Sequence, residues 1–374
     1  MSIDLLAWLK MDAETRFSEI IKPKFRQYCD IEGEGVVKIC GLYRNSLQNR
    51  INDLLRDHYK RQAAIYYGFY QSLDINASAH ERQGDPTAYI AISTGSPLNL
   101  LAHFSLVWSD PRNFPDYGNP AMELRDAPKS HRQPRDPVRS AAAVHMTNML
   151  VSFITYHEMA HILNGHLRLQ DTGKTTKQSL EEIPISIKRP LRMQTLEMDA
   201  DASATTDAIQ FVLMAEVDRN LKVDDYHADT ETALRHWLFA VATFFLLMQD
   251  GSRSAPINKS SHPPPDVRFY IVMKTLEAYF KQGRYPRFED KLEYYIREAM
   301  SKAQTAFASL SFDLFRKPAL GYSLMNFGEV EDYTIELLEE WTRLRPLLEP
   351  LSTGGNLAPA QFGLRPPKRR VLVQ

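Results

Sequence analysis

Cysteine is scarce in this chain of 374 residues, which contains only Cys29 and Cys40. Two cysteines are too few for the disulfide framework of a small secreted protein, and their spacing is not that of a zinc knuckle. The start of the chain, Met1 to Lys10, lacks the basic, then apolar, then small-residue pattern of a secretory signal. We therefore expect free thiols in a cytoplasmic protein. The alternative is one disulfide formed in an oxidising compartment.

Neither sign of charge dominates, because 45 Lys and Arg residues stand against 46 Asp and Glu residues. This balance gives no bulk attraction to nucleic acid or to an acidic membrane, so we expect no nucleic-acid partner. Long hydrophobic runs are missing too. The most apolar stretch, Trp237 to Met248, is shorter than the ~20 residues that a spanning helix needs, and we expect a buried core helix there. The sequence predicts no stable membrane span and leaves peripheral membrane association open.

The hydrophobic fraction of 44% is ample for a sizeable core. Apolar periodicity predicts the α+β class: a predominantly helical protein with a small sheet in its N-terminal half. In that half we expect strands at Val36–Tyr43 and Tyr89–Ser93, and a loop at Ala77–Pro86. The segment Ala64–Tyr70 could be a strand or a helix. A helix that Ser96 caps is expected to end near Trp108.

Composition divides the chain into an α/β region at 1–108, a proline-rich basic segment at 109–140, a helical region at 141–350 and a tail at 351–374 that we expect to be disordered. The proline-rich segment is long for a structureless loop. Such segments are usually functional, so we predict a lid over the active-site cleft, and a plain linker is the alternative.

The most informative stretch is His157-Glu158-Met159-Ala160-His161, within a region of helical, largely apolar sequence. Two histidines four residues apart lie on the same face of a helix and can occupy two corners of a tetrahedral zinc site. Glu158 points about 100° away around the helix, where it can reach a metal-bound water without being a ligand. Gly165 is the expected end of this helix. The alternative is a core helix with two hydrogen-bonded histidines.

A catalytic zinc takes three protein ligands and one open position. Glu197 is the best candidate for the third ligand. Asp201 lies one helical turn beyond it and could hydrogen-bond the outer nitrogen of a ligand histidine. The alternative is an acidic first helical turn that only favours the helix dipole. The candidates for an oxyanion donor are His262, Arg268 and Tyr156.

Between about Val144 and Lys274 the chain resembles the gluzincin zinc metallopeptidases, and it is similar in motif order to the HtpX-like peptidases. The motifs are His157-Glu158-x-x-His161, Asn164-Gly165-His166, Glu197-x-x-Ala200-Asp201, and Ser261-His262-Pro263 followed by Arg268. HtpX-like peptidases are usually embedded in membranes, and this chain departs from them because it lacks clear spanning helices.

The resemblance implies a zincin-like fold and a zinc-dependent endopeptidase with a protein or peptide substrate. The resemblance implies a role for each matching position. The zinc ligands are His157, His161 and Glu197, and the general base is Glu158. Asp201 lies behind the ligands, and His262 and Arg268 contact the substrate or the intermediate.

The stretch Tyr89 to Pro111 looks loosely similar to the Lit phage-exclusion peptidase family. That similarity implies a protease that cleaves one folded host protein in a defence role. In zincin folds a substrate peptide adds to a sheet edge as a further strand, and Tyr89 to Ser93 is the expected edge strand. His166 is expected to be a bystander, because it follows the glycine that ends the helix.

Two other classes of protein compete with a peptidase. A catalytically silent, zincin-fold binding or regulatory protein would hold the metal without turnover. Glu158 argues against that alternative, because a pure binding module has no use for an uncoordinated carboxylate beside the water. The second alternative is a helical structural protein in which the His157–His161 motif is accidental. Three further segments match the peptidase motifs, and they argue against this alternative.

Overall fold

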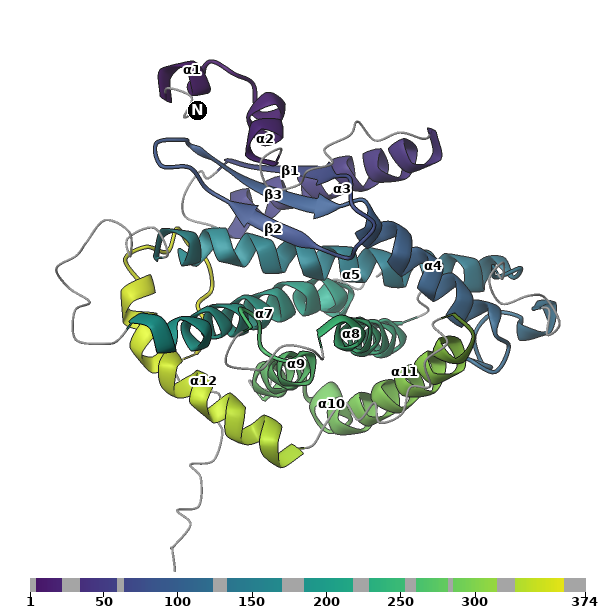
Figure 1. Ribbon diagram of the computed structural model, residues 1–374. Coiled ribbons are helices and arrows are strands. Elements are labelled where there is room, and N and C mark those ends of the chain that lie inside the picture. The colour runs from purple at the N-terminus through teal and green to yellow at the C-terminus, as the bar shows by residue number, and fades with distance from the viewer. Residues whose placement is uncertain are drawn as a thin grey trace, which may run out of the picture.

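The computed structural model describes residues 5–21, 34–58, 64–123, 133–169, 185–217, 229–252, 260–281, 285–314 and 327–359. In these ranges the protein is mostly helical with a small mixed sheet in the N-terminal half, as the sequence predicts (Figure 1). The helices are α1 (Leu5–Leu9), α2 (Ala13–Ile21), α3 (Glu34–His58), α4 (Gly95–Ser109), η1 (Pro120–Met122), α5 (Pro137–Leu163), α7 (Ile185–Val217), α8 (Thr230–Ser252), α9 (Pro265–Phe280), α10 (Pro286–Glu289), α11 (Leu292–Leu314) and α12 (Phe327–Leu348).

The sheet contains β1 (Ala64–Tyr70), β2 (Ala77–His80) and β3 (Thr87–Ser93) in the order β1-β3-β2. β1 runs parallel to β3, whereas β2 is antiparallel to it and places Ala77 opposite Ile92. Every residue of β3 is buried, because β3 has a strand on each side and helices pack on both of its faces. The expectation that β3 is an edge strand is therefore wrong, and the edges are β1 and β2.

Helices cover both faces of this sheet. Phe17 and Ile21 of α2 pack with Tyr89 on one face. The other face belongs to the main hydrophobic core, which joins residues of α3, α4, α5, α7, α8, α9 and α11. Figure 1 shows α5 running between the sheet and the helices α7 and α8. The second half of α5 is enclosed by protein, because every residue from Leu150 to Leu163 is buried.

The predicted strand at Val36–Tyr43 is wrong, because these residues belong to α3. Cys40, Leu47, Ile51 and Leu55 are buried and are spaced by whole helical turns, so they lie on one face of the helix. A helical period that extends over the whole segment outweighs the β-branched composition of its first part.

The prediction of a loop at Ala77–Pro86 is wrong for its first residues, because Ala77–His80 form the strand β2. The segment Ala64–Tyr70, which the sequence left open as either a strand or a helix, is the strand β1. Ser96 is not a helix cap, since α4 begins at Gly95 and no side chain caps it. The Ser96 hydroxyl instead accepts from Asn76 N and shares a hydrogen bond with Ser93 Oγ, which ties the start of α4 to the loop before β2.

α5 begins and ends with local signals that are visible in the sequence. Asp136 caps its N-terminus by accepting a hydrogen bond from Arg139 N, and Pro137 occupies the first turn. The helix ends at Leu163, and Gly165 follows with a φ of 81°. That left-handed conformation suits glycine, so the predicted helix end is confirmed.

The proline-rich segment folds around one buried side chain, that of Arg139. Its guanidinium donates hydrogen bonds to the backbone carbonyls of Trp108, Asp110, Asn113, Phe114 and Tyr117. Arg139 lies near the start of α5, and the 18 residues that separate it from His157 span roughly 27 Å of helix. The prediction of a lid over the histidines is therefore wrong for residues 109–123. Residues 124–132 lie outside the described ranges.

The C-terminal segment also differs from the expectation of disorder. Residues 351–359 pack against the end of α5 and against α7. Thr353 N donates to Leu163 O, Ala358 N donates to Asp199 Oδ1, and Ala358 is 3% exposed. Residues 360–374 lie outside the described part of the chain.

One helix in the described ranges, α8, is long and apolar enough over Thr230–Met248 to cross a membrane by length and composition. In the fold, 72% of that window is buried inside the protein. This burial agrees with the predicted core helix, and the same pattern is found in soluble proteins.

Candidate metal centre

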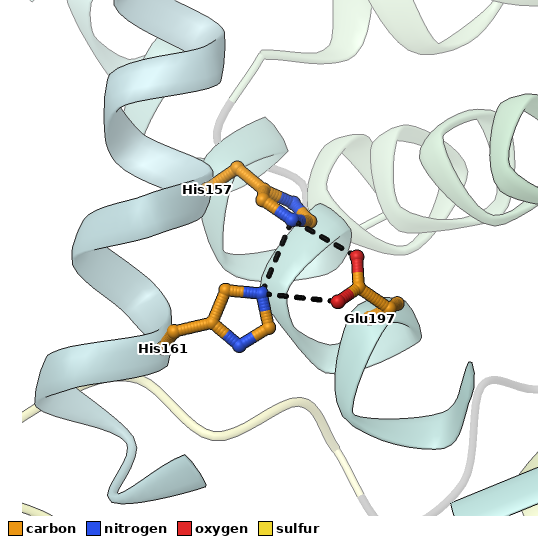
Figure 2. A group of neighbouring side chains, drawn as sticks. All are labelled: His157, His161 and Glu197. Atoms are coloured by element: carbon orange, nitrogen blue, oxygen red, sulfur yellow. Dashed lines mark hydrogen bonds and ion pairs between the residues drawn. The ribbon is translucent and has the colours of Figure 1, made fainter. Parts of the chain in front are cut away.

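Two side chains of α5 and one of α7 form a compact buried cluster (Figure 2). His157 and His161 project from the same face of α5, as their spacing predicts, and their Nε2 atoms are 3.2 Å apart. Glu197 reaches them from α7, with Oε2 3.2 Å from His157 Nε2 and Oε1 3.4 Å from His161 Nε2. The sequence-based expectation that these three residues meet is confirmed.

The spacing of the cluster fits a metal ion. Zinc bonds of about 2.0–2.1 Å in a tetrahedron place neighbouring ligand atoms about 3.3–3.4 Å apart, and the two Nε2 atoms, 3.2 Å apart, come close to that spacing. One ligand atom from each of the three residues lies within 4.8 Å of the other two. By hydrogen-bond geometry the buried Glu197 Oε2 has no donor among the described residues, and its 3.2 Å contact with His157 Nε2 is an ion pair only when that ring is protonated. A buried carboxylate oxygen without a donor is costly unless a cation satisfies it. His157, His161 and Glu197 could therefore hold a metal ion.

The electrostatics of the cluster favour a cation as well. Burial alone would lower the pKa of His157, but the carboxylates of Asp201 and Glu197 outweigh it and raise that pKa to about 10. Burial would raise the pKa of Glu197, and the two histidines hold it well below its usual range. A proton on His157 therefore balances Glu197 in the metal-free protein, and a bound metal would displace it.

Asp201 lies behind the ligands. Its Oδ1 is 2.9 Å from His157 Nδ1, on the side of the ring away from Glu197. Arg268 of α9 donates to both oxygens of Asp201, from Nε and Nη2 at 2.8 Å each. The sequence pattern placed Asp201 near a ligand histidine, and the structure identifies which one. Two N–H groups of Arg268 are used by this contact, so its expected contact with an intermediate stays a prediction.

Glu158 is outside the group that could bind metal and is 8% exposed. Burial raises its pKa, although the neighbouring histidines partly oppose the effect. Tyr70, the last residue of β1, is close enough that the Glu158 charge adds to burial in raising the tyrosine pKa. Tyr70 is a neighbour that sequence analysis missed, because only the sheet brings it there.

The predicted oxyanion donors occupy different places. His262 lies at the rim, with 57% of its side chain exposed and its Nε2 3.6 Å from Glu197 Oε2. Tyr156 lines a separate pocket with Arg50, Phe211 and other residues of α5, α7 and α8. Of these two candidates, only His262 faces the cluster.

His166 is not the bystander that the sequence suggested. It is fully buried, its Nδ1 lies 2.9 Å from His161 Nδ1, and its Nε2 lies 2.9 Å from Asp199 Oδ2. The helix-ending Gly165 turns the chain back, so that His166 reaches the ring of His161. The signal available in the sequence was a histidine directly after a helix-ending glycine.

The cluster offers the donor set of a catalytic zinc site: two imidazoles, one carboxylate, and a free carboxylate beside them. Comparison of the chain with protein-family models, curated protein sequences and solved structures found no match.

Proposed function

We propose that this protein is a zinc-dependent endopeptidase that hydrolyses peptide bonds of a protein or peptide substrate in the cytoplasm. The observation that carries the proposal is the compact buried cluster of His157, His161 and Glu197, with Glu158 beside it. A site that only bound metal would not need the buried Glu158 carboxylate next to it. The resemblance of the motifs to gluzincin peptidases supports the same function.

When bound at these residues, zinc would supply an activated water and polarise the scissile carbonyl. Glu158 takes a proton from the attacking water and passes it to the departing amine. The burial that raises its pKa favours this proton transfer. His262 stands at the rim, where its ring can donate to the developing oxyanion. Asp201 and Arg268 hold the ring of His157 in place.

The sheet edge suggests how a substrate binds. β2 packs against α5 and has β3 on one side, and its other side pairs with no strand in the described ranges. An extended peptide could add there as a further strand, held by backbone hydrogen bonds. We place this edge at β2 in preference to Tyr89–Ser93, because β3 is central. A role in phage exclusion is supported by the loose resemblance of Tyr89 to Pro111 to the Lit family.

The test compares wild type with Glu158→Gln at equal zinc content. New N-termini are labelled in host lysate after expression of each protein. Glu293→Gln, at an exposed position on α11, is the matched control and is expected to behave as wild type. Cleavage by wild type and control, lost in Glu158→Gln, would support the proposal.

Equal cleavage by wild type and Glu158→Gln would show that the assignment is wrong. Zinc binding without cleavage by any of the three proteins would instead identify the catalytically silent binding or regulatory protein.

A further inference from the structure

His166 connects the metal cluster to a buried polar chain that the proposed mechanism does not use. Gly165 has a φ of 81°, and this turn brings His166 back against His161, with ring centroids 5.0 Å apart. His166 is fully buried between α5 and α7. A fully buried imidazole needs partners for both ring nitrogens, and it has one on each side.

The hydrogen bonds fix which nitrogen carries each proton. The Nε2 atom of His161 faces Glu197, so if it binds metal the neutral ring keeps its proton on Nδ1. That N–H points at His166 Nδ1, which must then accept. The proton of His166 therefore sits on Nε2 and is donated to Asp199 Oδ2.

Asp199 is itself held from two sides. Its Oδ2 accepts from Asn164 Nδ2 at 2.5 Å, and its Oδ1 accepts from Ala358 N at 2.6 Å. Asn164 also donates to Ser203 Oγ, whose hydroxyl donates to Asn356 O. The C-terminal segment thus closes the chain of hydrogen bonds that begins at His161.

The segment fits closely against the turn after α5. Ser352 Oγ and Thr353 N both donate to Leu163 O, one of the carbonyls that a helix end leaves without a helical partner. A Cβ at Gly165 would lie 2.8 Å from Leu351, and one at Gly355 would lie 1.8 Å from Asn164 Oδ1. Glycine at both positions permits this approach.

We propose that His166 is the positioning residue of the metal ligand His161, and that Asp199 and the segment Ser352–Ala358 hold His166 in that role. The proposal rests on the proposed function only in that His161 binds the metal. The two ligand histidines are thereby held differently. A carboxylate paired with an arginine lies behind His157, whereas a neutral histidine accepts from His161.

The experiment uses the full chain and zinc alone. The zinc dissociation constants of wild type, His166→Leu and His166→Asn are measured by competition with a chelator of known affinity. Leucine fills the space but cannot accept from His161. Asparagine can place its oxygen where Nδ1 stood. We expect zinc affinity to fall about 10- to 100-fold in His166→Leu, and asparagine to restore most of it.

His236→Leu is the matched control. His236 is a buried histidine ringed by Trp108, Phe114 and Tyr117, away from the cluster. Its loss removes a buried imidazole without touching the metal ligands, so zinc affinity should match that of wild type. An equal loss of affinity in both leucine variants would show a general folding defect and would overturn the proposal.

A second measurement detects the tautomers directly. Long-range proton–nitrogen spectra of the zinc-loaded wild type should show His161 protonated at Nδ1 and His166 protonated at Nε2. Protonation of His166 at Nδ1 would overturn the proposal, and so would a His166→Leu variant with wild-type zinc affinity. Zinc binding without peptide cleavage would refute the peptidase function and leave this inference standing, whereas a wild type that binds no zinc would refute both.

Discussion

Arg268 and Asp201, 67 residues apart in the chain, form a bidentate ion pair. Arg268 Nε and Nη2 each donate to one carboxylate oxygen of Asp201, with nitrogen–oxygen distances of 2.8 Å. The pair is buried, and the same carboxylate lies 2.9 Å from His157 Nδ1. It therefore links α7 and α9 and orients a metal ligand at the same time. Burial would lower the pKa of Arg268, but Asp201 raises it, so the guanidinium stays charged.

Arg268→Leu leaves the Asp201 carboxylate buried without its cation. We expect a loss of about 3–5 kcal/mol in the free energy of unfolding of the metal-free protein, measured in urea. The double variant Asp201→Leu/Arg268→Leu should recover much of that stability, because no uncompensated charge remains. It should not recover zinc affinity, since His157 has lost its partner. A double variant that bound zinc as wild type does would show that Asp201 does not orient the ligand.

Zinc binding should release a proton at neutral pH. Without metal, His157 has a pKa raised to about 10, so it is protonated at pH 7, whereas a metal ligand must be neutral. Glu197 contributes no proton, because its pKa is held well below the usual range. We expect the apparent zinc affinity to rise about tenfold per pH unit from pH 7 towards pH 10. Calorimetry in buffers of different ionisation enthalpy counts the protons released, and a count of zero would contradict this assignment.

The stability of the metal-free protein should have the opposite dependence on pH. A histidine pKa raised in the fold above its unfolded value of about 6.5 adds stability that is complete below that value. As the pH rises from about 7 through 10, His157 loses its proton in the fold and this contribution disappears. Urea unfolding of the chelator-treated protein at pH 6, 8 and 9.5 should show this decline, and His157→Asn should show less of it.

Zinc should stabilise the fold against heat, because it binds the assembled residues and not the unfolded chain. At a free concentration 1,000 times the dissociation constant, the gain is about 4 kcal/mol. Glu197→Gln removes the carboxylate ligand while keeping its size, so the rise in melting temperature on adding zinc should largely vanish. Glu329→Gln, an exposed glutamate in the first turn of α12, is the control and should keep the full rise.

Arg139→Lys tests whether the proline-rich segment serves the fold or the site. Lysine cannot donate to all the carbonyls that the buried guanidinium reaches, so several would lose their partners. We expect a loss of roughly 3 kcal/mol or more in the free energy of unfolding. Zinc affinity should stay unchanged, because roughly 27 Å of helix separates the two positions. The exposed Arg135→Lys is the control for stability, and a drop in zinc affinity in Arg139→Lys alone would show that the segment also affects the metal cluster.

The sequence by itself determined whatever depends on neighbours within one helix. His157 and His161 share a face because a helix turns every 3.6 residues, and Gly165 ends that helix because it adopts a positive φ at little cost. The same local geometry placed Asp201 one turn from Glu197. The spacing of His262 and Arg268 alone did not reveal that one lies at the rim and the other behind a ligand.

Tertiary structure decided everything that depends on distant segments. Val36–Tyr43 became helix because a longer amphipathic face packs into the core, and Ala77–His80 became a strand because β3 supplies its hydrogen bonds. His166 has its partner Asp199 because α7 packs beside the turn after α5, and residues 351–359 pack against the same turn and hydrogen-bond Asp199. A local pattern records which side chains share one face of an element. Which buried donor meets which acceptor depends on how elements far apart in the chain pack together, because a buried polar group must find its partner wherever the fold places one.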